Sequence, residues 1–342
     1  MWLLLRIIKI EKSIAVPAVD RDNQDRNDRQ WSKANQADTV VVTSSSSPRK
    51  SSAPTQQPAS QSRVTSSSSP RQPLADICIV GGGKMGSALA GGILGSGVVL
   101  PEQLVIVESM SDRREALSTF LPAEVSVTRD IVSLERSVDS VILAVKPADM
   151  ENACKDIAAL DPHPSRMLSI VAGITIDRLQ SSLRVDIPVI RSMPNTPALV
   201  GAGVSALAPS SDCTEEDILW AERILGAVGA TVRLKEEYLD AVTGLSGSGP
   251  AYIFLVAEAL VEGGVLVGLD RATAGTLVAN TILGAARLWL ETGEDPAALR
   301  AQVTSPGGTT AAGLSVLEQR AIRAAFQDAV QSATLRSREL GH

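Results

Sequence analysis

Two glycine-rich stretches of this chain carry the residues best suited to chemistry. The first is GGGKMG at residues 81–86, which follows the apolar run at 77–80 and precedes helix-forming sequence. In that context the backbone amides of a Gly-x-Gly-x-x-Gly loop bind the pyrophosphate of a dinucleotide. The second is SPGGTT at residues 305–310, and amides at the start of a helix attract a small anion. The chain is therefore predicted to hold a dinucleotide and a small carboxylate.

An acidic residue lies where the second strand of a dinucleotide fold is expected to end. Glu108 comes about 20 residues after Gly86, the spacing at which a carboxylate binds the adenosine ribose of NAD. Ser109, Ser111, Arg113 and Arg114 follow it and would suit the 2′-phosphate of NADP. The alternative for the two arginines is a solvated first turn of a helix. These residues leave the choice between NAD and NADP open.

Four other stretches follow expected strands or open an expected helix. AVKP at 144–147, SIVAG at 169–173 and RSMPNTP at 191–197 each end a strand, and such ends border the ligand crevice of a parallel sheet. In the first stretch, Lys146 either contacts the cofactor or is an ordinary exposed loop lysine. The other two stretches either border the crevice or are tightly packed, rigid connections. The Gly-Ser sequence at 243–252 either lets two helices pack closely or forms an exposed loop beside a cleft.

Composition excludes several function classes. The 342 residues are 44% hydrophobic and 20% charged, as expected for a soluble protein of two domains. The net charge of −6 argues against nucleic acid or an anionic membrane surface as a partner. Cys78, Cys154 and Cys213 lack a CxxC spacing, which indicates reduced core thiols in a cytosolic protein. With only His163 and His342, neither a histidine triad nor a metal site is expected.

The elements that must position these motifs indicate an α/β fold. Apolar runs alternate with helical patterns between Leu74 and about Leu234, which predicts a Rossmann-like, doubly wound and mostly parallel sheet. Strands are expected at 77–80, 104–107, 141–145, 168–171, 189–190 and 204–208, and helices at 83–95, 112–120, 148–159, 176–182 and 214–227.

The strand pattern stops after about Lys235, so residues 236–342 are predicted to form an all-helical domain after the Rossmann-like domain at 74–235. Its helices are expected at 251–260, 271–290, from 295 onward and 321–338. Residues 251–267 are apolar almost all round, which indicates a buried core helix or one shared with another subunit, and their two carboxylates argue against a membrane span. Residues 1–73, rich in Ser, Pro and Gln, are predicted to be a disordered extension.

From about residue 74 to 340 the sequence resembles pyrroline-5-carboxylate reductase. The shared stretches, in family order, are GGGKMG, AVKP at 144–147, MPNTP at 193–197, GLSGSGPAY at 244–252 and TSPGGTT at 304–310. The resemblance implies a cytoplasmic enzyme that reduces the cyclic imine of 1-pyrroline-5-carboxylate to L-proline with NADPH or NADH, the last step of proline biosynthesis. It also implies an all-α dimerisation domain that completes each active site across a homodimer, alone or within an oligomer of dimers.

The resemblance further implies a role for each motif. The catalytic hydroxyl would be that of Thr310, facing the imine nitrogen. The substrate carboxylate would lie in the turn of Ser305, Gly307 and Gly308 on the amides of Thr309 and Thr310. The cofactor would contact Val80, Gly81, Gly82, Gly83, Lys84, Met85 and Gly86 at its pyrophosphate, Ser109 with Arg113 beside it at a 2′-phosphate, and Ala144, Val145, Lys146, Pro147, Ile170, Val171 and Ala172 around its nicotinamide. We expect NADPH to be preferred and NADH to be possible, although Glu108 departs from the small residue common before that serine.

The residue inventory agrees with this chemistry. A protonated imine is already electrophilic, so the enzyme needs mainly to position it beside a hydride donor. A β-hydroxyacid dehydrogenase would share the dinucleotide loop but needs a lysine in its second domain, and none lies between Glu236 and His342. A nucleotide-sensing binding protein with the same fold stays open as a second alternative.

Overall fold

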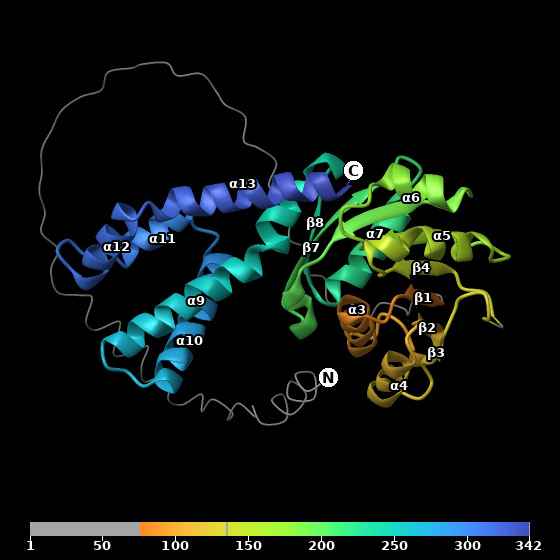
Figure 1. The fold of residues 1–342 in the computed structure, drawn as a ribbon, viewed down its shortest axis with the longest axis horizontal. Helices are drawn as coiled ribbons and strands as arrows, with labels where there is room; N and C mark the ends of the chain where they lie inside the picture. The colour runs from red at the N-terminus through yellow and green to blue at the C-terminus, as the bar shows by residue number, and fades with distance from the viewer. Residues whose placement is uncertain (1–75, 135, 342) are drawn as a thin grey trace, which may run out of the picture. The chain divides into compact units, whose positions relative to one another are not determined.

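The sheet of this protein runs through the first part of the chain that the structure describes. In the computed structural model the described residues are 76–134 and 136–341, so the extension expected at 1–73 lies outside them. The strand order is β3-β2-β1-β4-β5-β6-β7-β8 (Figure 1). The strands are β1 Ile77–Val80, β2 Leu104–Val107, β3 Ser126–Thr128, β4 Ser140–Leu143, β5 Arg166–Ser169, β6 Val189–Met193, β7 Gly203–Pro209 and β8 Gly229–Arg233.

The sheet is mostly parallel, as the sequence predicts. Neighbouring strands pair in parallel except β6 and β7, which are antiparallel. Strands β1, β2 and β4 are buried along their whole length, because a parallel sheet is covered on both faces. The sequence missed β3 and β8, which lie at the two edges of the sheet and contain no buried residue.

Helices cover both faces of the sheet. They are α3 Lys84–Gly95, α4 Ser111–Phe120, α5 Met150–Ala158, α6 Ile176–Leu183 and α7 Glu215–Gly226. Side chains of β1 alternate between two cores: Ile77 and Ile79 pack in the core that contains buried residues of α3 and α7, whereas Cys78 and Val80 pack in the core that contains those of α5 and α6. This division confirms the predicted doubly wound fold.

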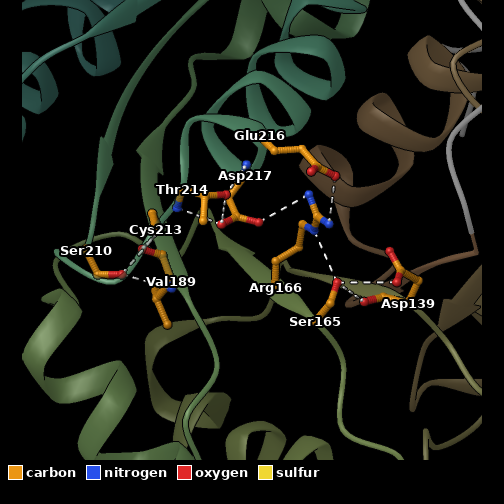
Figure 2. A network of polar contacts seen from close by, with 9 residues as sticks. All are labelled: Asp139, Ser165, Arg166, Val189, Ser210, Cys213, Thr214, Glu216 and Asp217. Carbon is orange, nitrogen blue, oxygen red and sulfur yellow. Dashed lines mark hydrogen bonds and ion pairs between the residues drawn. The ribbon is translucent and has the colours of Figure 1, made fainter.

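A charge network around the buried Asp217 fastens the sheet to α7. Arg166 of β5 forms ion pairs with Asp217 at 3.2 Å and Glu216 at 3.5 Å, and its guanidinium lies 5.8 Å from the centre of the Trp220 ring. Figure 2 shows the guanidinium pointing at the two carboxylates in the first turn of α7. Asp217 also forms a capping box with Thr214, which confirms the helix start predicted there.

The three cysteines are free, and their positions match the expected core thiols. Cys78 and Cys154 are buried, and Cys213 is partly buried. Burial raises the pKa of the Cys78 thiol to about 12 and that of Cys154 to about 11, so both stay uncharged at neutral pH.

After β8 the chain is helical to the last described residue. The elements are η4 Glu236–Tyr238, α8 Leu239–Val242, the π-helix η5 Thr243–Gly247, α9 Gly249–Leu266, α10 Arg271–Thr292, α11 Pro296–Gln302, α12 Thr309–Gln319 and α13 Ile322–Gly341. The exposed Gly-Ser loop considered for 243–252 is therefore wrong. Glycine serves close packing instead, because a Cβ on Gly244 would lie 2.4 Å from Thr334 Oγ1 of α13 and 2.8 Å from the Val330 carbonyl oxygen.

Three hydrogen bonds and one backbone contact hold this helical part together and against the sheet domain. Glu236 accepts hydrogen bonds from the buried Arg191 of β6 at 2.9 Å and from the backbone amide of Ile176 at 2.8 Å. The Ser337 hydroxyl of α13 donates to Asp240 of α8 at 2.7 Å. A Cβ on Gly341 would lie 2.6 Å from the Gly173 carbonyl oxygen, so the end of α13 touches the loop after β5.

The apolar helix α9 is not a core helix of the single chain. None of its residues is buried, and Phe254 and Leu266 are 70% and 88% exposed. The buried-core alternative is thus wrong, which leaves a helix shared with another subunit. Among the described residues the helical stretch Glu236–Leu266 contains an 18-residue segment with a mean hydropathy of 1.4, which is long and apolar enough to span a membrane by length and composition alone, so Glu258 and Glu262 do not exclude a span on that criterion.

Candidate functional site

The dinucleotide loop is shaped by glycines at the end of β1. Gly81 has a φ of +110°, and a Cβ there would lie 2.5 Å from the Ala144 carbonyl oxygen. A Cβ on Gly86 would lie 2.0 Å from the Gly81 carbonyl oxygen. Gly83, which caps α3, has no atom within 4 Å of its Cβ position. The first and last glycines therefore close the turn, and Gly83 leaves open space at a helix N-terminus, which fits a pyrophosphate.

Glu108 is attached to this loop. Its carboxylate accepts hydrogen bonds from the backbone amides of Gly82 at 3.1 Å and Met110 at 2.9 Å, and the residue is only 5% exposed. Arg113 lies 3.7 Å from the same carboxylate with a half-exposed side chain. The guanidinium of Arg114 donates instead to the backbone carbonyls of Glu108 and Ser109, at 2.9 and 2.7 Å. Arg113 is thus paired rather than merely solvated, and Ser109, which directly follows Glu108, is exposed.

The expected nicotinamide residues lie at adjoining strand ends. The Ala144 amide donates to the Val80 carbonyl at 2.8 Å, and the Ile170 amide donates to the Leu143 carbonyl at 3.0 Å. The carboxyl ends of β1, β4 and β5 therefore lie side by side, with the predicted stretches 144–147 and 170–172 following the last two. Within these stretches Lys146 and Pro147 are exposed, Val171 is buried, and Ala172 is exposed.

A pocket of about 230 Å³ opens at this place. It joins the dinucleotide loop, the end of β5, the loop after β6 and the π-helix, and its lining residues are Met85, Ile170, Ala172, Met193, Pro194, Asn195, Thr196 and Gly247. Its shape and mixed lining fit a planar ring bound at strand ends. The sequence placed the 191–197 loop either in the crevice or in a rigid connection, and it considered the stretch around Gly247 as a possible border of a cleft; both stretches line this pocket.

A second pocket of about 360 Å³ shares Asn195 with the first. Its other lining residues come from the loop after β6, the π-helix and the start of α9: Pro197, Ser246, Gly249, Pro250, Ile253 and Phe254. The stretches at 191–197 and 243–252, which the sequence considered as possible borders of a crevice or cleft, supply most of this wall, whereas Ile253 and Phe254 of α9 were not expected in it.

The predicted carboxylate nest has the expected local geometry. Gly307 has a φ of +70°, and the Gly308 amide donates to the Ser305 carbonyl at 3.0 Å, which closes a turn with Pro306 and Gly307 at its centre. Helix α12 starts at Thr309 without a side-chain cap, so its first amides are free for an anion. Thr309 and Thr310 are exposed, and no nest residue lines either pocket.

This arrangement defines a class: a doubly wound sheet with a glycine-rich loop and a ring-sized pocket at its strand ends is that of a nicotinamide-dependent oxidoreductase. A family model described as "NADP oxidoreductase coenzyme F420-dependent" matches residues 76–173. A second, described as "Pyrroline-5-carboxylate reductase dimerisation", matches residues 236–340. The chain belongs to the pyrroline-5-carboxylate reductase family.

Individual relatives agree over nearly their whole length. A pyrroline-5-carboxylate reductase of Methanosarcina acetivorans is 43% identical, over 78% of this chain and 97% of the relative. The solved structure of the Coxiella burnetii enzyme has a TM-score of 0.73 at 33% identity, covering 78% of this chain and 99% of that one. The Plasmodium falciparum enzyme, solved with NADP bound, has a TM-score of 0.69 at 28% identity, covering 80% and 100%. The predicted family, fold class and enzyme class are confirmed.

Proposed function

We propose that this reductase takes a hydride preferentially from NADPH and delivers it to the cyclic imine of 1-pyrroline-5-carboxylate, which gives L-proline. The observation that carries the proposal is the pocket of about 230 Å³ that is lined both by Met85 of the dinucleotide loop and by Ile170 and Ala172, which directly follow β5. A ring held there lies at the carboxyl ends of β1, β4 and β5, beside the loop that fits a pyrophosphate. The 193–196 stretch and Gly247 line the same pocket, and the imine ring would lie against them.

The substrate's carboxylate is assigned to the nest before α12. The uncapped amides of Thr309 and Thr310 would bind it, with Gly307 and Gly308 shaping the turn. The Thr310 hydroxyl would hydrogen-bond the imine nitrogen and orient the imine carbon. A bound reduced nicotinamide supplies the hydride, so the protein's own contribution is to orient the imine, neutralise its carboxylate and exclude water.

The preference for NADPH is assigned to Ser109 and Arg113. Arg113 is half exposed and 3.7 Å from Glu108, so it can turn toward a 2′-phosphate while staying near the carboxylate. Glu108 opposes this preference, because its charge lies where the ribose diol of NADH would be bound. We therefore expect NADH to be used as well, with a higher KM.

The second pocket and the exposed helices are assigned to a homodimer, either alone or assembled into a larger oligomer. The match of residues 236–340 to a dimerisation domain and the exposed apolar side chains of α9 support this assembly. A second copy would cover Phe254 and its neighbours and would bring a partner's nest to each nicotinamide pocket. We place this assembly in the cytoplasm, with a second copy rather than lipid on the apolar surface and no nucleic acid as a partner.

Oxidation of NADPH on addition of pyrroline-5-carboxylate tests the proposal, with proline as the product. A β-hydroxyacid dehydrogenase would oxidise reduced cofactor only with an oxo-acid, and a nucleotide-sensing protein would bind NADPH without turnover. Either result would contradict the proposed function.

A further inference from the structure

Asn195 lies where the β6–β7 ladder is interrupted. The register pairs Met193 with Ala206, and continuing it by two residues places Asn195 opposite Val204. The backbone turns away there into the short helix η3 Thr196–Val200. The side-chain oxygen of Asn195 replaces the missing backbone acceptor and takes a hydrogen bond from the Val204 amide at 2.9 Å.

The other end of the same carboxamide serves the π-helix. Asn195 Nδ2 donates to the Ser246 carbonyl at 3.1 Å. In a regular helix that carbonyl would accept from residue 250, but residue 250 is a proline and has no amide hydrogen. The next amide, of Ala251, donates to Ser248. Asn195 therefore supplies the donor that the sequence of the helix itself lacks.

The orientation of this carboxamide is fixed by its partners. One partner is a backbone donor and the other a backbone acceptor, so a flipped side chain would oppose both of them. Asn195 is also only 8% exposed. The group is thus held at both ends in a place with little water to replace either hydrogen bond.

The bond fixes a wall between two pockets. Asn195 lines both of them; Gly247 lines the smaller and Ser246 the larger. A Cβ on Gly247 would come 3.0 Å from the Met193 side chain, so the wall lies directly against the end of β6. Moving Ser246 would also move its neighbour Gly247, and would therefore change the smaller pocket that Gly247 lines together with Ile170 and Ala172.

We propose that Asn195 is a positioning residue that holds the Ser246–Gly247 wall, and thereby sets where the imine ring lies relative to the nicotinamide site. The proposal rests on the proposed function. Asn195 acts through the wall and not on the reacting atoms. The dinucleotide loop would bind the cofactor at its pyrophosphate and not at its nicotinamide, so a change in the wall should leave most of the affinity for NADPH intact.

The test starts with Asn195→Asp, which keeps the acceptor for Val204 and places an oxygen against the Ser246 carbonyl. We expect kcat/KM for pyrroline-5-carboxylate to fall about tenfold or more, with the Kd of NADPH within about threefold of wild type. Asn152→Asp makes the same chemical change on an exposed residue of α5 and should leave both values unchanged.

Pro250→Ala distinguishes positioning from a general packing defect. Alanine restores an amide that can donate to Ser246, so in that background Asn195→Asp should cost about threefold or less. An equal loss in both backgrounds, or wild-type kcat/KM in Asn195→Asp, would overturn the proposal. A parallel loss of NADPH affinity would overturn it as well.

Thermal unfolding and amide hydrogen exchange complete the test. Thermal unfolding is measured for Asn195→Asp and for a second variant, Asn195→Ala. If neither variant folds, Asn195 is needed for folding and the positioning role is overturned. If the wild-type chain does not reduce pyrroline-5-carboxylate, the proposed function fails on its own. Faster exchange at 243–250 in Asn195→Asp would still support the restraint on the wall, and unchanged exchange would refute it.

Discussion

Single residues at this site differ in what a substitution would disturb. A side chain on Gly81 would collide with the Ala144 carbonyl and one on Gly86 with the Gly81 carbonyl, whereas a Cβ on Gly83 would have no neighbour within 4 Å. Gly83 also has a φ of −68°, which any residue adopts. Substituting Gly83 is therefore expected to spare the fold and block only the open space assigned to the pyrophosphate.

At the residue scale the first prediction concerns Thr310. Thr310→Val removes the hydroxyl assigned to the imine nitrogen and keeps the backbone amide of α12. We expect kcat/KM to fall about ten- to a hundredfold, equivalent to about 1.4–2.7 kcal/mol for one hydrogen bond used in the transition state. Steady-state kinetics with a separate NADPH titration measures it, because cofactor affinity should stay nearly unchanged. Wild-type turnover would remove Thr310 from the mechanism.

The second prediction concerns cofactor choice. Arg113→Ala should raise the KM for NADPH far more than that for NADH, since only NADPH loses a charge-assisted contact. Glu108→Gln should act in the opposite sense, lowering the KM for NADPH by removing a nearby negative charge. The four KM values of the two variants, set against wild type, test the assignment. Equal changes for the two cofactors in either variant would contradict it.

At the element scale the contact of the π-helix with α13 gives a stability prediction. Gly244→Ala would drive a methyl group into Thr334 and the Val330 carbonyl, and we expect it to lower the free energy of unfolding by about 1–3 kcal/mol. Gly91→Ala is the matched control in α3, where a Cβ has no neighbour within 4 Å; it should stabilise by about 0.5–1 kcal/mol. Denaturant unfolding of the two variants gives both values, and equal effects would refute the packing argument.

The charge network between β5 and α7 gives the fourth prediction. Arg166→Met leaves the buried Asp217 without its cation and should lower the free energy of unfolding by about 2–3 kcal/mol, less than for a fully buried pair because Arg166 is partly exposed. Kinetic constants should not change, since the network is separate from both pockets. Lys235→Met, which removes an exposed pair with Glu237 at 3.8 Å, is the control and should cost almost nothing. Equal losses of stability in the two variants would show that burial does not strengthen the network.

At the scale of the whole molecule, no residue of the nest lines either pocket of the same chain, and this separation leads to a prediction about assembly. A Gly83→Asp chain should lack cofactor binding, and a Thr310→Val chain should lack the imine contact. If each site uses the dinucleotide loop of one subunit and the nest of its partner, a mixed dimer contains one intact site. Equal mixing should then restore about a quarter of wild-type activity, because half of the dimers are mixed and each has one site of two.

The control for this experiment is the dimer itself. The unfolding midpoint should rise with protein concentration, because folding of α9 is coupled to association. An active monomer in sedimentation, or mixed dimers that form and recover no activity, would contradict the shared site.

The sequence by itself determined the family, the α/β class and most of the elements. Those features depend on local patterns. Buried strands show as apolar runs and helices as periodic ones, and the glycine spacing at 81–86 and 305–310 predicts turns that the structure contains. The edge strands β3 and β8 were missed because they lack a buried run. Their pairing depends on neighbours and not on their own composition.

Only the tertiary structure decided how distant residues are joined. It showed that the Glu108 carboxylate accepts a hydrogen bond from the Gly82 amide and that Asn195 donates one to the Ser246 carbonyl. It also showed that no residue of α9 is buried within the single chain. It also made the stretch 243–247 a π-helix rather than a loop, with Gly244 against α13. Each of these depends on which segments meet in space, and hydrogen bonds and close packing between segments leave no periodic trace in the sequence of either one.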